Sequence, residues 1–448
     1  MNTIQQETSA LTRLALPVVI TQLGNMMLWV VDVIMVGAVG YEELGAATLG
    51  RLMIMGTMMF GMGVVLGIDP LITQAHGAGD GPRAGRALQT GLVLATLVSI
   101  PIGIVWLFTE PLLAWTGQDP GLSTMADDYV LVQLPLIPFF LLFTVLRQYL
   151  QGRAIVYPTM VVVFLGNAVN VLANWALIFG KFGFPELGLV GAGIATCITQ
   201  GFMLAGLVAW IRMGRLHSGA WSGWCRSAWS WSHLGEVVGF GIPVAFQISL
   251  EMWAFVAAAL LAGWIGKVEL AAHTIVINIA SVSFMVPLGI SFAAVTRVGN
   301  LIGERNGPGA QRAAWVSFAM GGGVMIAFAV LFIAARHTLP TIYADEPAVI
   351  ALAATLLPVA AAFQLFDGLQ VVGSGILRGM GQTLPAAMFN LVGYYVLALP
   401  LAYWMAFSLG MGLKGIWWGL CIALAVVAVL LLLWVALKGP GKVDARIV

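Results

Sequence analysis

The stretch GAGDGPRAGRA at residues 77–87 returns as GERNGPGAQRA at residues 303–313, a shift of 226 (77 to 303). The two segments share three turn formers, Gly, Gly and Pro, and then Ala, Arg and Ala at matched positions. The same shift pairs further residues: Pro17 with Pro243, Gly37 with Gly263, Gly40 with Gly266, and Glu43 with Glu269. A shift that holds over so much of the chain indicates a duplicated sequence.

The composition shows which solvent the two repeats are built for. Hydrophobic residues make up 60% of the 448 and charged residues only 9%, against about 25% charged in an ordinary soluble domain. Apolar runs of about twenty residues recur along the chain, which is the length of helix that crosses a hydrocarbon core of about 30 Å. They lack the two-residue alternation of a membrane β-barrel. The sequence therefore predicts an all-α membrane protein.

We expect twelve transmembrane helices, six in each repeat. Their predicted ranges are 13–38, 48–75, 84–109, 129–150, 157–180, 187–211, 236–263, 270–300, 310–335, 347–374, 384–408 and 413–437. An even number of spans puts both termini on the same side of the membrane. The start of the chain lacks a basic region before its first apolar run, which argues against a cleaved signal peptide.

The repeats predict a division of the chain into two lobes. Residues 1–211 form the N-terminal lobe and residues 236–438 the C-terminal lobe, with a linker at 212–235 and a tail at 439–448. Six spans per repeat insert both lobes the same way up, so we expect a pseudo-two-fold axis along the membrane normal and a central cavity. Tryptophans beside arginines predict that the linker lies at the cytoplasmic membrane surface.

Basic residues predict the orientation. Five lysines and arginines fall on the side opposite the termini: Arg51, Lys181, Lys267, Arg336 and Lys414. The other fifteen of the 20, Arg446 among them, fall on the side of the termini. The positive-inside rule then places both termini in the cytoplasm, with the chain in the cell inner membrane. A net charge of +1 gives no indication of a nucleic-acid partner.

Four carboxylates fall inside the predicted spans: Asp32, Asp69, Glu251 and Asp367. A charge at the bilayer centre costs about 2.5–3.5 kcal/mol on insertion scales, so each should face the protein interior or water. The repeat places uncharged residues opposite three of them: Ala258 opposite Asp32, Asn25 opposite Glu251, and Phe140 opposite Asp367. Since the duplicated prolines and glycines are matched and these acids are not, we infer that the acids serve a task beyond the scaffold.

Glu251 and Asp367 lie in the C-terminal lobe, with Glu251 near the middle of its span. Removal from water favours the neutral form of a carboxyl group, which suits a proton carrier or an anchor for a cationic ligand. The alternative is an interhelical hydrogen bond that serves packing alone. Asp69 precedes Pro70 near a helix end, so it is an accessory candidate whose role, structural or functional, stays open.

Three asparagines share one face of the span 157–180. Asn167, Asn170 and Asn174 are spaced i, i+3 and i+7. Together with Thr196 and Asp32, their oxygens predict a shell for a hard monovalent cation. The alternative is hydrogen bonding between helices. We take Asn167 as an accessory member of this site.

Other chemistries find little support in the sequence. No Walker motif supports ATP hydrolysis, no HExxH supports a catalytic metal, and three scattered cysteines do not make a metal site or a disulfide framework. We therefore expect a secondary transporter that is not an enzyme and needs no cofactor. Two alternatives stay open: a lipid-linked oligosaccharide flippase, which needs a basic cavity, and a polytopic lipid-modifying enzyme, which needs acidic or histidine motifs near the interface.

Several motifs together resemble one family. They are Leu16-Pro17, Gly241-Ile-Pro243, Asp32-Val-Ile-Met-Val-Gly37, Thr73-Gln-Ala-His-Gly77-Ala-Gly79-Asp80, Arg297-Val-Gly-Asn300-Leu-Ile-Gly303, Phe366-Asp367-Gly-Leu-Gln370 and Leu377-Arg378-Gly379. In these motifs and over nearly its whole length, the sequence resembles the multidrug and toxic compound extrusion (MATE) transporters, in their NorM-like bacterial branch.

The resemblance implies a function and its residues. It implies export of bulky organic cations by alternating access, in exchange for Na⁺ or H⁺. Glu251 and Asp367 fall on the acids that couple cation to substrate, and the N-terminal ion site falls on Asp32, Asn170, Asn174 and Thr196. Phe363 stands where some relatives have tyrosine, which weakens the case for Na⁺ in the C-terminal lobe. We expect a monomer that works among membrane lipids, with small organic cations as substrates.

Overall fold

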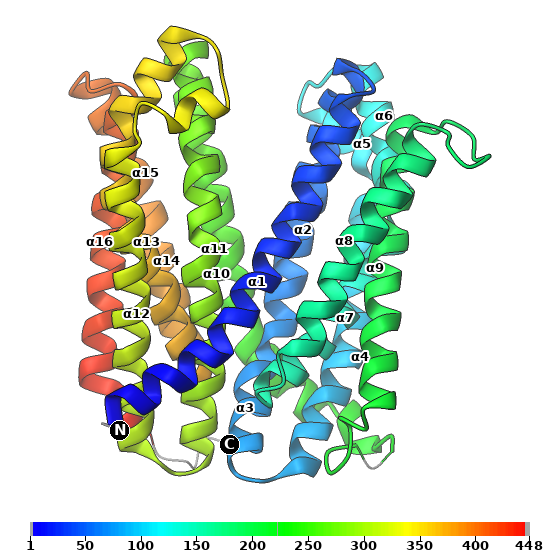
Figure 1. Ribbon diagram of the computed structural model, residues 1–448, viewed down its shortest axis with the longest axis vertical. Helices are drawn as coiled ribbons and strands as arrows, with labels where there is room; N and C mark the ends of the chain where they lie inside the picture. The colour runs from blue at the N-terminus through cyan, green and yellow to red at the C-terminus, as the bar shows by residue number, and fades with distance from the viewer. Residues whose placement is uncertain (1–2, 222, 444–448) are drawn as a thin grey trace. The chain divides into compact units, whose positions relative to one another are not determined.

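The computed structural model describes residues 3–221 and 223–443, and within those ranges the regular elements are helices, without strands. Arg446 and the end of the predicted tail lie outside the described residues. Figure 1 traces the chain from α1, drawn in blue, to α16, drawn in red.

The chain folds into two compact units. Unit 1 comprises Met1–Val19, Thr73–Gly79 and Phe246–Val448; unit 2 comprises Ile20–Ile72 and Asp80–Ala245. The boundary between the units falls inside the long helices α1 (Thr3–Gly37) and α10 (Trp231–Ile265). Each of these helices therefore contributes a segment to both units.

The first half of the chain continues with shorter helices. After α1 come α2 (Tyr41–Val65), η1 (Leu66–Ile68), α3 (Asp69–Gly77), α4 (Gly81–Trp106), α5 (Thr109–Trp115), α6 (Pro120–Leu131), α7 (Leu136–Gly152), α8 (Tyr157–Ile178), α9 (Gly188–Met213) and η2 (Arg226–Trp229).

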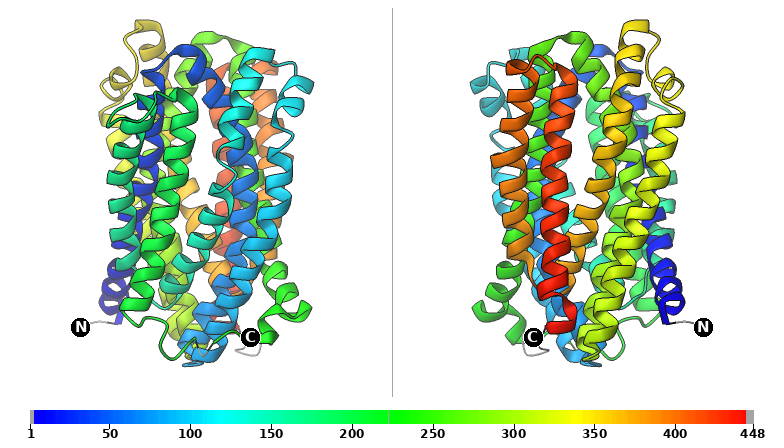
Figure 2. Two further views of the ribbon diagram at one scale, coloured as in Figure 1. Left: turned by 90° about the vertical axis from the view of Figure 1, so that its right-hand side faces the viewer. Right: turned by 90° about the vertical axis from the view of Figure 1, so that its left-hand side faces the viewer.

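The second half consists mainly of long helices. After α10 come α11 (Lys267–Gly303), α12 (Gly307–Ala334), η3 (Leu339–Ile342), α13 (Pro347–Gly379), α14 (Thr383–Leu391), η4 (Val392–Ala398), α15 (Leu399–Tyr403), η5 (Trp404–Ser408), α16 (Leu413–Lys438) and η6 (Pro440–Lys442). Figure 2 shows the red helix α16 beside the orange helices that precede it, which it contacts along α15 and η4.

The helices match the predicted spans. Eleven described helices are long and apolar enough to cross a membrane, and α6 with α7, which meet at a bend of 48°, make a twelfth if they are one span. Large apolar side chains stay exposed along helix faces; Leu97, Ile100 and Ile104 form one such stripe on α4. A stripe of this kind suits contact with lipid. The prediction of a twelve-helix membrane protein is confirmed.

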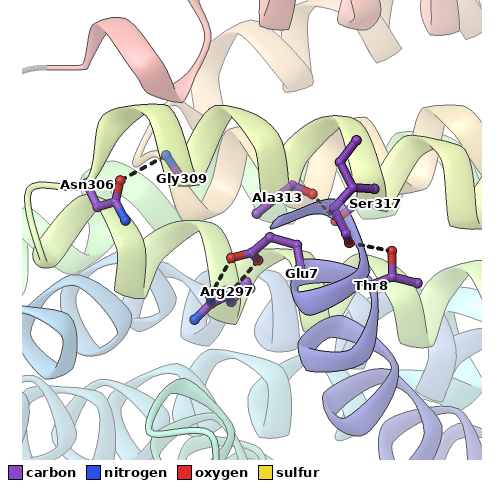
Figure 3. A network of polar contacts seen from close by, with 8 residues as sticks. Glu7, Thr8, Arg297, Asn306, Gly309, Ala313 and Ser317 are labelled. Atoms are coloured by element: carbon purple, nitrogen blue, oxygen red, sulfur yellow. Dashed lines mark hydrogen bonds and ion pairs between the residues drawn. The ribbon is translucent and has the colours of Figure 1, made fainter. Parts of the chain in front are cut away.

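The repeat is visible in how matched helices begin. The Asp80 carboxylate accepts a hydrogen bond of 3.0 Å from the Arg83 amide at the start of α4. The Asn306 carboxamide oxygen does the same for Gly309 at 2.9 Å at the start of α12 (Figure 3). Asp80 and Asn306 are matched under the shift, and a proline follows each in the first turn. The duplicated sequence thus specifies a duplicated helix start.

The first helix begins well before the predicted residue 13. Glu7 and Arg297 explain this, since both belong to unit 1 and the guanidinium donates to both carboxylate oxygens, at 2.9 and 2.6 Å (Figure 3). Both side chains are largely shielded from solvent, at 12% and 26% exposed. A bidentate, partly buried pair of this kind is stronger than an exposed one. It orders the first turns of α1 against α11.

The segment between α9 and α10 is held to α4 within unit 2. The Gln89 carboxamide donates to the Gly223 carbonyl at 2.7 Å and accepts from the Cys225 amide at 2.8 Å. Thr90 donates to the Ala228 carbonyl at 3.1 Å. One buried side chain of α4 thereby satisfies two backbone groups of an otherwise irregular segment.

We predict that Gly63→Ala destabilises unit 2 and that Gly239→Ala does not. A Cβ at Gly63 would lie 2.6 Å from the Ala245 backbone nitrogen, whereas at Gly239 it would meet nothing within 4 Å. Overpacking of this kind costs about 1–3 kcal/mol. Thermal unfolding of the purified protein in detergent measures both; equal midpoints would contradict the close packing of α2 on α10.

Candidate ion and substrate sites

Asp32 lies at the centre of a polar cluster in unit 2. Its Oδ1 accepts hydrogen bonds from the carboxamides of Asn170, at 3.1 Å, and Asn174, at 2.6 Å. Its Oδ2 accepts from the Thr196 hydroxyl at 3.3 Å. All three helices, α1, α8 and α9, belong to this unit from residue 20 onward. The structure thus brings together the four residues that were expected to form the N-terminal site.

The chemistry of this cluster is that of a carboxylate surrounded by neutral oxygen ligands. Asn170 and Asn174 are one helical turn apart and fully buried, and the Asn174 amide also donates to the Asn170 oxygen at 3.3 Å. The Asn174 oxygen itself is buried without a hydrogen-bond partner. A half-turn of a carboxamide about its last side-chain bond exchanges its donor for its oxygen. The same side chains can therefore stabilise a bare carboxylate or surround a cation.

Asn167 does not join this cluster. Its amide donates to the Gly24 carbonyl at 3.0 Å and to the Val163 carbonyl at 2.9 Å. Asn167 therefore connects α8 to the backbone of α1 at Gly24, which lies more than one helical turn before Asp32. Asn167 therefore fits the alternative of hydrogen bonding between helices. Asn170 and Asn174, which hydrogen-bond to Asp32, fit the expected ion site.

Sequence reasoning missed two neighbours of Asp32. Arg51, on α2, lies near enough to act electrostatically on the Asp32 carboxyl. Tyr129, on α6, lies within the field of both and beside Arg51. Arg51 was expected near the outer end of its span and was counted only toward orientation. The signal that could have indicated a role near Asp32 is that Arg51 is an isolated basic residue inside an apolar helix.

A second cluster forms around Glu251 in unit 1. Glu251 Oε2 accepts hydrogen bonds of 3.3 Å from both the Gln370 and the Asn390 carboxamides. Gln370 also donates to the Asn390 oxygen at 3.2 Å. Both amides are fully buried, and they come from α13 and α14. Neither was predicted, although Gln370 lies one turn after Asp367 and so on its face of the helix.

Asp367 belongs to the same cluster. Its carboxyl is 6% exposed and lies close enough to Glu251 for their charges to repel. Asp367 Oδ1 and Gln370 Oε1 are buried without hydrogen-bond partners. Two acids that share a dry site disfavour double ionisation. A proton or another cation bound between them removes this repulsion.

An irregular helix borders this cluster. Residues Val392–Ala398 form a π-helical segment, η4, that continues α14. Tyr394 in this segment lies by the Glu251 carboxyl, and the next residue, Tyr395, donates to the Leu250 carbonyl at 3.2 Å. The wider turn thus directs two consecutive tyrosines to the α10 segment that carries Glu251. Such π-helical segments are frequent at functional sites.

Phe363 stands one turn before Asp367 and supplies no oxygen. Its ring is 1% exposed and packs edge-on against Phe255 and Trp417, at centroid distances of 6.1 and 5.4 Å. It forms an apolar wall beside the acids. The cluster of unit 1 therefore takes its oxygens from carboxyl, carboxamide and Tyr394 groups.

Asp69 makes a separate side-chain hydrogen bond within unit 2. Its Oδ1 accepts a hydrogen bond of 2.7 Å from the Gln148 carboxamide, and both side chains are buried. The acid is in the first turn of α3, just after the short helix η1. Across residues 3–221 and 223–443, histidine, cysteine and acidic side chains nowhere gather in threes that would hold a metal ion.

The sequence matches a known family model. The MatE model matches residues 17–176 and 243–404. The two matches begin at Pro17 and Pro243, which are the prolines that the internal repeat aligns. They cover most of each repeat.

Curated relatives match over nearly the full length. A probable multidrug resistance protein NorM from Mesorhizobium japonicum is 37% identical over 445 residues, which cover 96% of this chain and 94% of the relative. The multidrug resistance protein NorM of Burkholderia vietnamiensis is 35% identical and covers 94% and 91%. The mouse multidrug and toxin extrusion protein 2 is 31% identical and covers 96% and 74%.

Solved structures agree on the fold. The crystal structure of a eukaryotic MATE transporter matches with a TM-score of 0.91 at 26% identity and covers 99% of this chain and 98% of that one. A multidrug resistance MATE family transporter described as outward-facing matches at 0.87 and 20% identity, with 98% of each chain covered. At that identity the likeness shows the fold alone. The fold is that of the MATE transporters.

The chain belongs to the MATE family of multidrug efflux transporters and is similar to its NorM members. It is accordingly a transporter and not an enzyme, and the resemblance that its motifs indicated is confirmed.

We predict that Asp69→Asn leaves transport and stability near their normal values, because the carboxamide oxygen can still accept from Gln148. Gln148→Leu should lower stability by about 1–3 kcal/mol, since it removes a donor to a buried carboxyl. Thermal unfolding in detergent and dye efflux from cells measure the two effects. Loss of efflux in correctly inserted Asp69→Asn protein would instead assign this acid to the transport machinery.

Proposed function

We propose that the chain exports small organic cations in exchange for Na⁺ or H⁺. The relatives' names describe multidrug resistance and multidrug and toxin extrusion, which suggests varied small organic substrates. The basic residues support a position in the cell inner membrane with both termini in the cytoplasm. On this proposal the chain works as a monomer surrounded by lipid.

The observation that carries this proposal is that two clusters of buried acids contain acceptor oxygens without hydrogen-bond partners. In unit 2, Asp32 is surrounded by two carboxamides and a hydroxyl. In unit 1, Glu251 and Asp367 lie together, and Asp367 Oδ1 has no hydrogen-bond partner. Buried acceptor oxygens of this kind are costly unless something binds them in part of the working cycle. A proton or a hard cation satisfies that requirement at either cluster.

Competition for these acids supplies the coupling. A cationic substrate and a coupling ion that both need an ionised carboxyl group disfavour one another, and that effect is reciprocal by thermodynamic necessity. Entry of the ion from outside would then release the substrate there, and loss of the ion inside would restore the acids for the next substrate. Phe255 is only partly buried and supplies aromatic surface beside the unit 1 acids, with the buried rings of Phe363 and Trp417 packed in the same cluster, and this surface suits flat cations.

We predict that Glu251→Gln and Asp367→Asn each abolish export while the protein still inserts. Both changes keep the shape of the side chain and remove the charge that binds a cation. Proteoliposomes loaded with a fluorescent cation and given a Na⁺ gradient or a pH gradient measure export. Glu304→Gln, which removes an exposed acid at the end of α11, is the control for net charge. Normal export in either site variant would exclude its assigned role.

We predict that Asn174→Ala impairs coupling and that Asn167→Ala, on the same helix, does not. Asn174 donates to Asp32 at 2.6 Å, whereas Asn167 bonds only to backbone carbonyls. Asn174→Ala should raise the concentration of driving cation needed for half-maximal export by about tenfold, because it removes the buried carboxamide oxygen that is free to coordinate the cation. Equal shifts in the two variants would show that the asparagine face serves packing alone.

A further inference from the structure

Arg51 is held beside the Asp32 cluster without being bonded to it. Its guanidinium carbon lies 5.9 Å from the ring centroid of Trp29. Trp29 is three residues before Asp32 on α1, so the two side chains lie on neighbouring parts of the same helix face. The cation–π contact therefore places a permanent positive charge next to the candidate ion site.

The rest of the surroundings keep the guanidinium near Asp32. Arg51 is half-buried on α2, and its charge acts on both Asp32 and the buried hydroxyl of Tyr129 on α6. The neighbouring Gly50 permits close packing, since a Cβ there would lie 2.7 Å from the Tyr129 ring. Arg51 is thus confined between α1 and α6, with its guanidinium at the Trp29 ring and at the Tyr129 hydroxyl.

One nitrogen of the Arg51 guanidinium is an unused hydrogen-bond donor. Its Nη2 is buried and has no hydrogen-bond partner. Among the described residues, the ion pair within 4.0 Å is that of Arg297 with Glu7, so Arg51 and Asp32 are near but unpaired in this structure. A buried guanidinium nitrogen without an acceptor is unfavourable, and Asp32 is the acid within its field.

The internal repeat sets these two charges apart from the scaffold. The shift that places Ala258 opposite Asp32 places Ile277 opposite Arg51. Both charges are therefore present in one repeat and missing from the other.

We propose that Arg51 is a tethered cation that occupies the Asp32 carboxylate when the transported cation has left it. This inference rests on the proposed ion site at Asp32. A bare carboxylate in a dry protein interior is costly, and a guanidinium that moves onto it neutralises the charge. An incoming cation must then displace Arg51. This competition lowers the affinity of the site for the cation and favours release of the cation. Trp29 and Tyr129 hold the guanidinium while the ion is bound.

The test uses the purified full chain in proteoliposomes that contain a fluorescent cation. Export is measured over a series of external Na⁺ concentrations at constant pH, and over a series of pH gradients at constant Na⁺. In Arg51→Gln, the concentration of the driving cation at half-maximal export should fall about five- to tenfold, because a nearby unit charge has been removed. Arg51→Lys, which keeps the charge, should stay near the wild-type value.

The controls distinguish failure of the tethered-cation proposal from failure of the proposed ion site at Asp32. Arg336→Gln removes an exposed arginine and should not change half-saturation. Unchanged half-saturation in Arg51→Gln, or equal shifts in Arg51→Gln and Arg51→Lys, would overturn the tethered cation. Normal export by Asp32→Asn would instead overturn the proposed ion site itself. If Arg51→Gln does not fold, Arg51→Met keeps the apolar length of the side chain and replaces it in the same series.

Discussion

A carboxylate in the hydrocarbon region of a membrane has no water to bind, so the protein must supply every partner it has. This constraint shapes both units. Asp32 is met by two carboxamides and a hydroxyl from α8 and α9, and Glu251 by two carboxamides from α13 and α14. Helices that share an acid must stay in register with one another, so each cluster fixes the packing of its unit. Buried oxygens of Asn174 and Asp367 remain without hydrogen-bond partners, which supports the proposal that each cluster binds a cation.

The two clusters solve the same problem with different chemistry. In unit 2 the charge of Arg51 lies near the single acid Asp32. In unit 1 the two acids Glu251 and Asp367 lie together, and the described hydrogen bonds of that cluster include no basic side chain. The first arrangement suits exchange of one small cation against a tethered charge. The second suits a larger cation beside the aromatic wall of Phe363, Phe255 and Trp417. On the proposed function, the duplicated scaffold carries unlike sites, one in each half.

The regular parts of the scaffold are repeated in detail, down to the caps at Asp80 and Asn306. The irregular parts are not repeated. The π-helical segment η4 belongs to the second half, where it places Tyr394 by Glu251 and bonds Tyr395 to the Leu250 carbonyl. The salt bridge of Glu7 with Arg297 likewise orders the first turns of α1 in unit 1 alone. The segment η4 thus lies by the acid Glu251, and the Glu7–Arg297 pair lies on α1, a helix that contributes to both units.

The sequence by itself determined the helices, their number and the identity of the buried acids. Apolar length decides which segments span a membrane, and a charge inside such a segment is visible as a letter. Helical spacing also put Asn167, Asn170 and Asn174 on one face, and Asp32 was the carboxylate expected to lie near it. Only the tertiary structure decided that Asn167 turns to the backbone of Gly24, that Gln370 and Asn390 hold Glu251, and that Arg51 stands beside Asp32. These depend on how helices distant in sequence rotate and pack against one another, and hydropathy and spacing carry no information on that rotation.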